Sequence, residues 1–317
     1  MKRILFFFIL MILLQSCTTK SINGELIFTE ANPSDGFNFP YFLFIPEGTS
    51  SEKELTLIVE PNNSGFADDD FKRHIEKAER TATLDFYIGN FVARQLKQPL
   101  LVPVFPRSKS DWQIYTHALD SDVIVQKDNP LERIDLQLLA MVADAETKLN
   151  RAGYTIRDKI FMTGFSASAS FTNRFTLIHP QKIQAAAAGG LNGLLMLPTG
   201  ELKGERLNFP IGTGNFELVF GKSFDSVSYA QTPQFYFMGA LDDNDAIPYE
   251  DAYSENEREL IYKLLGKEMM PTRWEKCKQI YENKKVNASI KTYPEIGHEQ
   301  ADKVKMEVVE FFKQKQL

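Results

Sequence analysis

The sequence predicts an α/β protein whose mostly parallel central sheet of about eight strands carries helices on both faces. From about residue 55 onward, short apolar runs typical of strands alternate with longer segments of helical periodicity. Leu55–Val59 is a continuous run rich in β-branched residues, as expected of a strand that is covered on both faces. Such alternation favours parallel strands joined by crossover helices.

The other strands are predicted by short apolar runs bounded by turn-forming residues. Runs at 25–29 and 39–45, separated by turn formers at 32–36, predict an antiparallel hairpin at the start of the fold. Further strands are expected at 100–105, 160–162, 184–190, 234–238 and 288–293. Over 191–231 the alternation dissolves into glycine, proline and scattered aromatic residues, so we expect an insertion there, either a lid or a β-rich cap.

The helices are predicted by apolar periodicity and by signals at their ends. Asp68–Asp70 stand at the start of a helix over 68–83, where the helix dipole favours acidic residues. Ile134 and Leu138 lie on one face of a helix over 130–150, which ends just before Gly153. Further helices are expected over 254–265, 272–283 and 300–313.

The first residues have the features of an export signal. Lys2 and Arg3 precede the apolar run Ile4–Leu14, which is too short to span a bilayer comfortably. The residues Leu-Leu-Gln-Ser before Cys17 resemble the lipobox of bacterial lipoproteins. This resemblance implies that Cys17 is lipidated and becomes the new N-terminus. The alternative is a plain signal peptide with an incidental cysteine.

These features predict a signal peptide over 1–16, a short tether over 17–23 and a single domain over 24–317, exported and lipid-anchored to the bacterial cell envelope. Acylation of Cys17 would leave Cys277 alone, so we expect no intrachain disulfide. The membrane is then a partner through lipidated Cys17. The net charge of −6 and the pI near 5.4, with no basic stripe, argue against a nucleic-acid partner.

A serine lies where a predicted strand turns sharply into a predicted helix. The segment Gly164-Phe-Ser166-Ala-Ser168 follows the strand at 160–162, and the helix continues past Phe171. A serine between small residues at such a turn is presented as a nucleophile. Gly164 is expected where strand and helix pack too closely for a side chain. The usual pattern is G-x-S-x-G, and the last position here is Ser168, which is still small.

An activated serine needs an imidazole, and the sequence has four histidines. We expect His74 to be solvated on a charged helix, His117 to line a pocket or lie in its aromatic loop, and His179 to end a helix. His298 follows Gly297 on the loop after the last predicted strand, where the ring can turn toward the sheet edge. His298 is therefore the candidate base.

The imidazole in turn needs a carboxylate, and we expect it on the loop after the strand at 234–238. Asp242 lies three residues past Gly239 and is the preferred candidate, with Asp245 as the main alternative. The acids of this loop also suggest calcium, but the glycine and the closing glutamate of an EF-hand loop are missing at the required offsets. We expect no metal and no organic cofactor.

The sequence resembles the α/β-hydrolase superfamily over about residues 25–315. The resemblance lies in the chain order of Ser166, Asp242 and His298, each of which follows a predicted strand. The segments Gly164-Phe-Ser-Ala-Ser168, Gly239-Ala-Leu-Asp242 and Gly297-His298 carry this resemblance. It implies an α/β-hydrolase fold and a serine esterase or prolyl-oligopeptidase-like hydrolase. It also implies that oxyanion donors come from the backbone of Ala167 and from Asn62 or Asn63.

The resemblance implies acyl transfer from an ester or amide substrate, either a small molecule or a group borne on a polymer. We expect an esterase before a peptidase, because the sequence has no propeller-sized second domain to filter peptides. A single-domain serine peptidase and a catalytically inactive binding lipoprotein are the alternatives. Arg107 could meet a substrate carboxylate or be solvated. The candidate pocket residues, which could equally pack under loops, are Trp112, Tyr115, Phe209 and Phe216.

Overall fold

The computed structural model describes residues 22–62 and 65–316. The predicted signal peptide, Cys17, most of the tether and Asn63 lie outside the described residues. Within the described part of the chain, no helix is both long enough and apolar enough to cross a bilayer.

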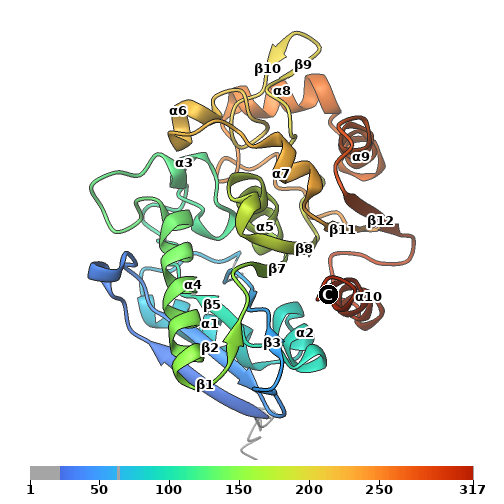
Figure 1. The fold of residues 1–317 in the computed structure, drawn as a ribbon. Coiled ribbons are helices and arrows are strands. Elements are labelled where there is room, and N and C mark those ends of the chain that lie inside the picture. Colours follow the sequence, from blue (N-terminus) through green and yellow to red (C-terminus); the bar gives the residue numbers. More distant parts are fainter. Residues whose placement is uncertain (1–21, 63–64, 317) are drawn as a thin grey trace, which may run out of the picture.

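An eight-stranded sheet forms the centre of the molecule, in the order β1-β2-β5-β4-β7-β8-β11-β12 (Figure 1). Its strands are β1 Gly24–Thr29, β2 Tyr41–Pro46, β4 Ile58–Val59, β5 Leu100–Pro103, β7 Ile160–Phe165, β8 Ile183–Gly189, β11 Gln234–Gly239 and β12 Ala288–Tyr293. Strand β2 runs antiparallel to β1 and β5, and the pairs from β5 to β12 are parallel. The predicted fold class and the opening hairpin are therefore confirmed.

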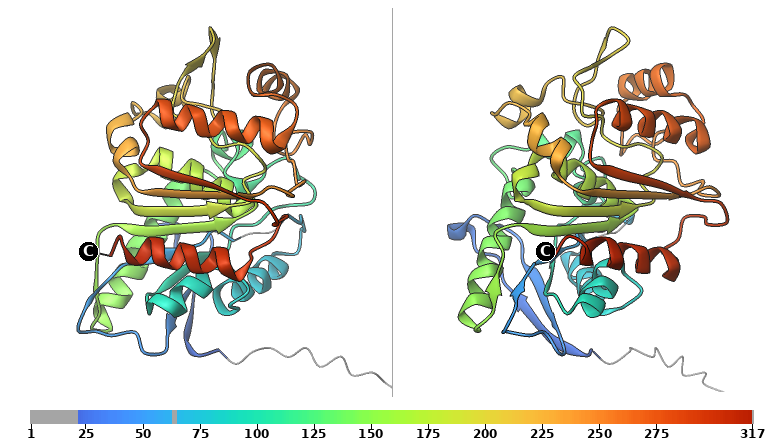
Figure 2. Two further views of the ribbon diagram at one scale, coloured as in Figure 1. Left: turned by 90° about the vertical axis from the view of Figure 1, so that its right-hand side faces the viewer. Right: turned by 45° about the vertical axis from the view of Figure 1, so that its right-hand side comes forward.

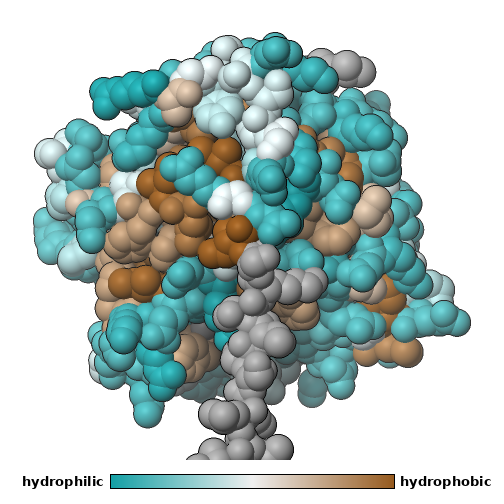
Figure 3. Space-filling view, turned by 90° about the horizontal axis from the view of Figure 1, so that it is seen from below, coloured by the Kyte–Doolittle hydropathy of each residue, from teal (hydrophilic) through white to brown (hydrophobic). Residues whose placement is uncertain are grey.

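Helices cover both faces of the sheet. The α-helices are α1 Phe71–Thr83, α2 Ile88–Leu96, α3 Ser121–Ile124, α4 Ile134–Arg151, α5 Ala167–Ile178, α6 Phe216–Phe220, α7 Ser226–Gln231, α8 Glu255–Leu265, α9 Trp274–Asn283 and α10 Asp302–Lys313. Figure 2 shows α2 and α10 on one side of the sheet and α8 and α9 on the other. The space-filling view from below shows apolar patches separated by polar residues on the face where the described chain begins (Figure 3).

The core divides into two layers because successive strand residues point to opposite faces. Ile58 packs with the buried residues of α1, α2 and α10, whereas Val59 belongs to the larger cluster that includes α4, α5 and α9. On the first face, the rings of Phe161 and Phe312 stack with centroids 4.6 Å apart. The sheet is thus buried on both faces, as its apolar strands predict.

The structure differs from the sequence predictions in several local features. The strand expected over 55–59 is split, because Glu54–Leu55 (β3) pairs with Thr155–Ile156 (β6) outside the main sheet. Helix α2 is not predicted, because its nine residues are too few for a clear apolar period. The 191–231 segment is not β-rich: it holds α6, α7 and a single short hairpin of Glu201–Leu202 (β9) and Glu205–Arg206 (β10). Phe209 and Phe216 are buried within it and pack rather than line an open pocket.

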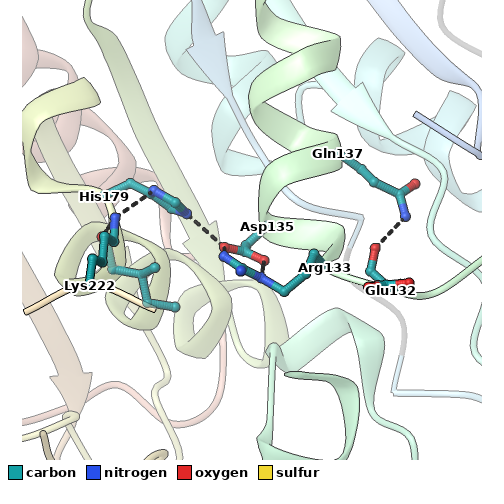
Figure 4. Close-up of polar contacts among 7 residues, drawn as sticks. Glu132, Arg133, Asp135, Gln137, His179 and Lys222 are labelled. Atoms are coloured by element: carbon teal, nitrogen blue, oxygen red, sulfur yellow. Dashed lines mark hydrogen bonds and ion pairs between the residues drawn. The ribbon is translucent and has the colours of Figure 1, made fainter. Parts of the chain in front are cut away.

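A buried ionic network fixes this segment to the body of the fold (Figure 4). Asp135, in the first turn of α4, lies 2.7 Å from Arg133 Nη2 and 2.8 Å from Nε2 of His179, which ends α5 as expected. Burial raises the pKa of Asp135, but the hydrogen bonds from Arg133 and His179 outweigh it and lower that pKa to about 2. Lys222, from the loop between α6 and α7, approaches the other imidazole nitrogen at 3.4 Å. His179 is therefore a structural residue.

Candidate active site

Ser166 occupies a strained turn between β7 and α5. Its φ of 61° and ψ of −124° are uncommon for a residue with a side chain. The turn is held by a hydrogen bond from Ser166 N to Gly189 O on the neighbouring strand, at 2.9 Å. A Cβ on Gly164 would lie 2.4 Å from the carbonyl oxygen of Ser168, so only glycine fits there. This geometry presents the Ser166 side chain at the carboxyl end of β7.

Ser168, which replaces the last glycine of the usual pattern, closes the turn by hydrogen bonds. Its Oγ accepts from the backbone N–H of Phe165 and donates to the carbonyl oxygen of Phe165, both at 2.9 Å. Ser168 is fully buried. The departure from the pattern therefore adds a contact across the turn.

Asp242 and His298 face each other at the same edge of the sheet. Asp242 follows β11 and His298 follows β12, and His298 Nδ1 lies 2.9 Å from Asp242 Oδ2. The second oxygen of Asp242 accepts a hydrogen bond from Asn244 N at 3.0 Å. Asp245, the alternative acid, instead pairs at 2.5 Å with Arg273, which is completely buried. The geometry thus gives the two aspartates different partners.

The loops that carry the acid and the histidine are in direct contact. Leu241 N donates to Ile296 O at 2.9 Å. A Cβ on Gly239 would lie 2.1 Å from the same carbonyl oxygen, so this approach requires glycine. The imidazole of His298 also packs on Phe165, the residue before Ser166, with ring centroids 4.8 Å apart. His298 is therefore held beside the turn.

Ser166 Oγ and His298 Nε2 do not hydrogen-bond to each other, although both residues belong to the described part of the chain. Instead, Nε2 lies 3.2 Å from Asn244 Nδ2. Such contacts are often loose in unliganded enzymes and tighten when substrate binds.

Two of the expected oxyanion donors are described. Ala167 is the first residue of α5, where backbone N–H groups lack intrahelical partners. Asn62 is completely buried after β4, and neither Oδ1 nor Nδ2 of its side chain has a hydrogen-bond partner among the described residues. A buried amide without partners is costly, so this side chain is available to a ligand group or a water molecule. Asn63 lies outside the described residues.

Three solved structures resemble this chain over most of their length. Poly(aspartic acid) hydrolase-1 from Sphingomonas sp. KT-1 is 12% identical, with 93% of this chain and 97% of that chain covered and a TM-score of 0.56. The poly(3-hydroxybutyrate) depolymerase LpqC from Bordetella parapertussis is 17% identical, with 88% and 85% covered and a TM-score of 0.51. An S-formylglutathione hydrolase from Agrobacterium tumefaciens is 9% identical, with 93% and 96% covered and a TM-score of 0.50.

The chain has the α/β-hydrolase fold. At these identities the likeness shows the fold alone. No protein-family model matches the sequence. No curated protein matches it either.

His74 and His117 support loops at the edge of the sheet that carries the candidate site. The prediction that His74 is solvated is wrong: α1 turns it inward, it is completely buried, and its Nε2 lies 2.9 Å from Asp68 O. His117 is also buried, with Nε2 2.8 Å from Phe105 O. The two rings lie 5.9 Å apart.

Arg107 likewise has a structural partner. Its guanidinium is buried, pairs with Asp251 at 2.6 Å and lies 3.6 Å from the ring centroid of Tyr115. This carboxylate contact joins the loop after β5 to the loop after β11. Trp112, in contrast, is 42% exposed.

Among the described residues, no group of three or more His, Cys, Asp or Glu side chains is arranged to hold a metal ion. Cys277 is a free, buried thiol.

The N-terminus of α2 joins the two loops that flank the site, a feature that the sequence does not predict. Gly89 N donates to Oε2 of Glu60 at 2.7 Å, and Glu60 lies two residues before Asn62. Ile88 N donates to Oε1 of Gln300 at 2.9 Å, and Gln300 lies two residues after His298. Burial raises the pKa of Glu60 to about 8, although the Gly89 N–H opposes this shift. The only signal in the sequence is a glutamate and a glutamine close to the candidate residues.

We expect Glu60→Gln to change how stability depends on pH. The pKa of Glu60 is raised from 4.5 to about 8 in the fold, so the folded state binds this proton more tightly than the unfolded chain. The resulting stabilisation is present below about pH 4.5 and is lost as the pH rises through about 8. Relative to Glu60→Gln, the free energy of unfolding of the wild type should fall across this window by on the order of 3–5 kcal/mol.

Urea unfolding at several pH values between these limits measures this difference. Glu47→Gln, at an exposed glutamate, is the control and should follow the wild-type curve. Parallel curves for the wild type and Glu60→Gln would contradict the proposed proton linkage.

Proposed function

We propose that this protein is a serine hydrolase that cleaves a carboxylic ester, or less readily an amide, through an acyl-enzyme. The strained turn at Ser166, beside the His298–Asp242 pair at the same sheet edge, is the observation that carries this proposal. The three solved structures support it at the level of a hydrolase, since their names denote hydrolases and a depolymerase.

In the proposed mechanism, His298 Nε2 accepts the proton of Ser166 as Oγ attacks the carbonyl carbon. The carbonyl oxygen becomes an oxyanion, which Ala167 N–H and a donor at Asn62 or Asn63 would stabilise. His298 then returns the proton to the leaving alkoxide or amine. A water molecule, deprotonated by His298, hydrolyses the acyl-enzyme and restores Ser166. Throughout, the carboxylate of Asp242 fixes the tautomer of His298 and stabilises its cation.

The substrate is proposed to be a small or polymer-borne ester that approaches an open site. The His298 side chain is 26% exposed, and Leu241, next to Asp242, is 67% exposed. These two groups offer a partly apolar surface on which the acyl or alcohol part of a large substrate can rest.

The anchor at the cell envelope is proposed on the sequence before Ile22 alone. Strand β1 runs in the same direction as the parallel strands. Its first residue therefore lies at the edge of the sheet opposite to the carboxyl ends that carry Ser166 and His298. A lipid on Cys17 would thus leave the site facing away from the membrane. Loss of membrane association in Cys17→Ala tests the anchor, and unchanged membrane association would reject it.

A fluorophosphonate probe tests the proposed nucleophile. We expect covalent labelling of the purified protein at Ser166, mapped by mass spectrometry of the modified peptide, and loss of labelling in Ser166→Ala and His298→Ala. Ser166→Ala should unfold at the same denaturant concentration as the wild type, because its side chain is partly exposed, and His298→Ala should still be folded where labelling is measured. Absence of labelling in well-folded wild-type protein would instead favour a binding protein on a hydrolase fold.

Substitution of Asp242 should affect catalysis, whereas substitution of Asp245 should affect stability. Asp242→Asn should lower kcat for an ester substrate by roughly 10³–10⁴-fold, because an amide can favour the wrong tautomer of His298. Asp245→Asn should instead lower the free energy of unfolding by roughly 3 kcal/mol, because it leaves the Arg273 charge buried without a counter-charge. Ester hydrolysis and urea unfolding of both variants measure these effects. The reverse pattern would assign the catalytic role to Asp245.

A further inference from the structure

Asn244 contacts both members of the His298–Asp242 pair. Its backbone N–H donates to Asp242 Oδ1 at 3.0 Å, and its side-chain nitrogen Nδ2 lies 3.2 Å from His298 Nε2. The same Nδ2 donates to Asn192 Oδ1 at 3.1 Å. Since a carboxamide nitrogen carries two hydrogens, both of its donors are directed, one to Asn192 and one to His298.

These contacts fit an imidazole that carries its hydrogen on Nδ1. His298 Nδ1 faces a carboxylate oxygen, so it carries the hydrogen, and Nε2 of the neutral ring then holds the lone pair. Asn244 Nδ2, whose orientation is set by the acceptor oxygen of Asn192, donates to that lone pair. This is the tautomer that a general base for Ser166 requires.

The same lone pair is needed by Ser166. Nε2 has only one, so a hydrogen bond from Asn244 and one from the Ser166 hydroxyl exclude each other. We propose that Asn244 is a positioning residue that occupies His298 Nε2 in the resting site and withholds it from Ser166 until the amide moves aside. This inference rests on the proposed function, because it assigns the resting state of the same base.

The contact is suited to displacement. Asn244 is exposed, and both partners of its side chain are neutral groups, so each hydrogen bond has a small net strength in water. The imidazole does not depend on it for its place. Asp242 holds Nδ1, Phe165 packs against the ring, and a Cβ on Gly190 would lie only 3.0 Å from Cε1. Removing the amide should therefore free Nε2 without moving the ring.

Asn192 connects this contact to the 191–231 segment. It lies three residues after the end of β8 and has a φ of 53°, a conformation that asparagine tolerates better than most residues. If the turn at Asn192 moved, the Asn244 amide would lose the acceptor that orients it. The 191–231 segment can thus change the hydrogen bonding of His298 without contacting substrate.

Two measurements on Asn244→Ala test the proposal. The rate constant for fluorophosphonate labelling of Ser166 should rise about two- to tenfold, the range expected for the loss of one competing neutral hydrogen bond. In protein labelled with [¹⁵N]histidine, the Nε2 resonance of His298, assigned with His298→Ala, should move toward the value of an unbonded, unprotonated nitrogen. A residue that only supported the loop would give slower labelling when removed.

Further variants separate the donor from its surroundings. Asn244→Leu keeps a similar shape without a donor and should match Asn244→Ala. Asn192→Gly, which accommodates a positive φ but lacks the acceptor, should shift both readouts in the same direction. Asp243→Asn is the control in the same loop, and it should label at the wild-type rate.

Faster labelling together with the shifted Nε2 resonance supports the proposal. Labelling of Asn244→Ala at or below the wild-type rate, or an unchanged Nε2 resonance, overturns it. If neither the wild type nor Asn244→Ala is labelled, the proposed function fails as well, whereas labelling of both at equal rates leaves the hydrolase intact and rejects the role of Asn244 alone.

Discussion

Ser166 adopts a backbone conformation with φ of 61°, and the site depends on the contacts that keep it there. Such a conformation costs about 1–3 kcal/mol and persists only where its surroundings determine it. Here the surroundings are the absence of a side chain at Gly164, the hydrogen bonds of Ser168 across the turn and the bond from Ser166 N to β8. Close packing of β7 against α5 thus holds the Ser166 hydroxyl away from its own helix and directs it to the edge of the sheet.

The parallel sheet supplies the remaining groups at that edge, and buried polar contacts fix them relative to one another. β4, β7, β11 and β12 all end there, so Asn62, Ser166, Asp242 and His298 converge without being close in sequence. The N-terminus of α2 binds Glu60 on one flank and Gln300 on the other, which ties the loop after β4 to the histidine loop. The proposed catalytic geometry therefore depends on the order of the strands in the central sheet.

The elements that could be predicted are those set by local sequence. Apolar runs and helical periods predict the strands, most helices and the turn at Ser166, because backbone and side-chain preferences within a few residues determine them. Contacts between distant segments could not be predicted. Asp242 and Asp245 share one loop, and only contacts with distant residues distinguish them: His298 for Asp242 and Arg273 for Asp245. His74 is buried because α1 turns that face to the sheet, and Gln300 meets α2 across 212 residues.

A crystal structure of the protein with a bound alkylphosphonate tests most directly whether the strained turn makes Ser166 an acyl-transfer nucleophile. We expect a covalent bond from Ser166 Oγ to phosphorus, with the phosphoryl oxygen about 2.7–3.1 Å from Ala167 N and from a second donor at Asn62 or Asn63. The Asn244 amide should have left His298 Nε2. A phosphonate bound to another residue, or a phosphoryl oxygen that points away from Ala167 into solvent, would contradict the claim.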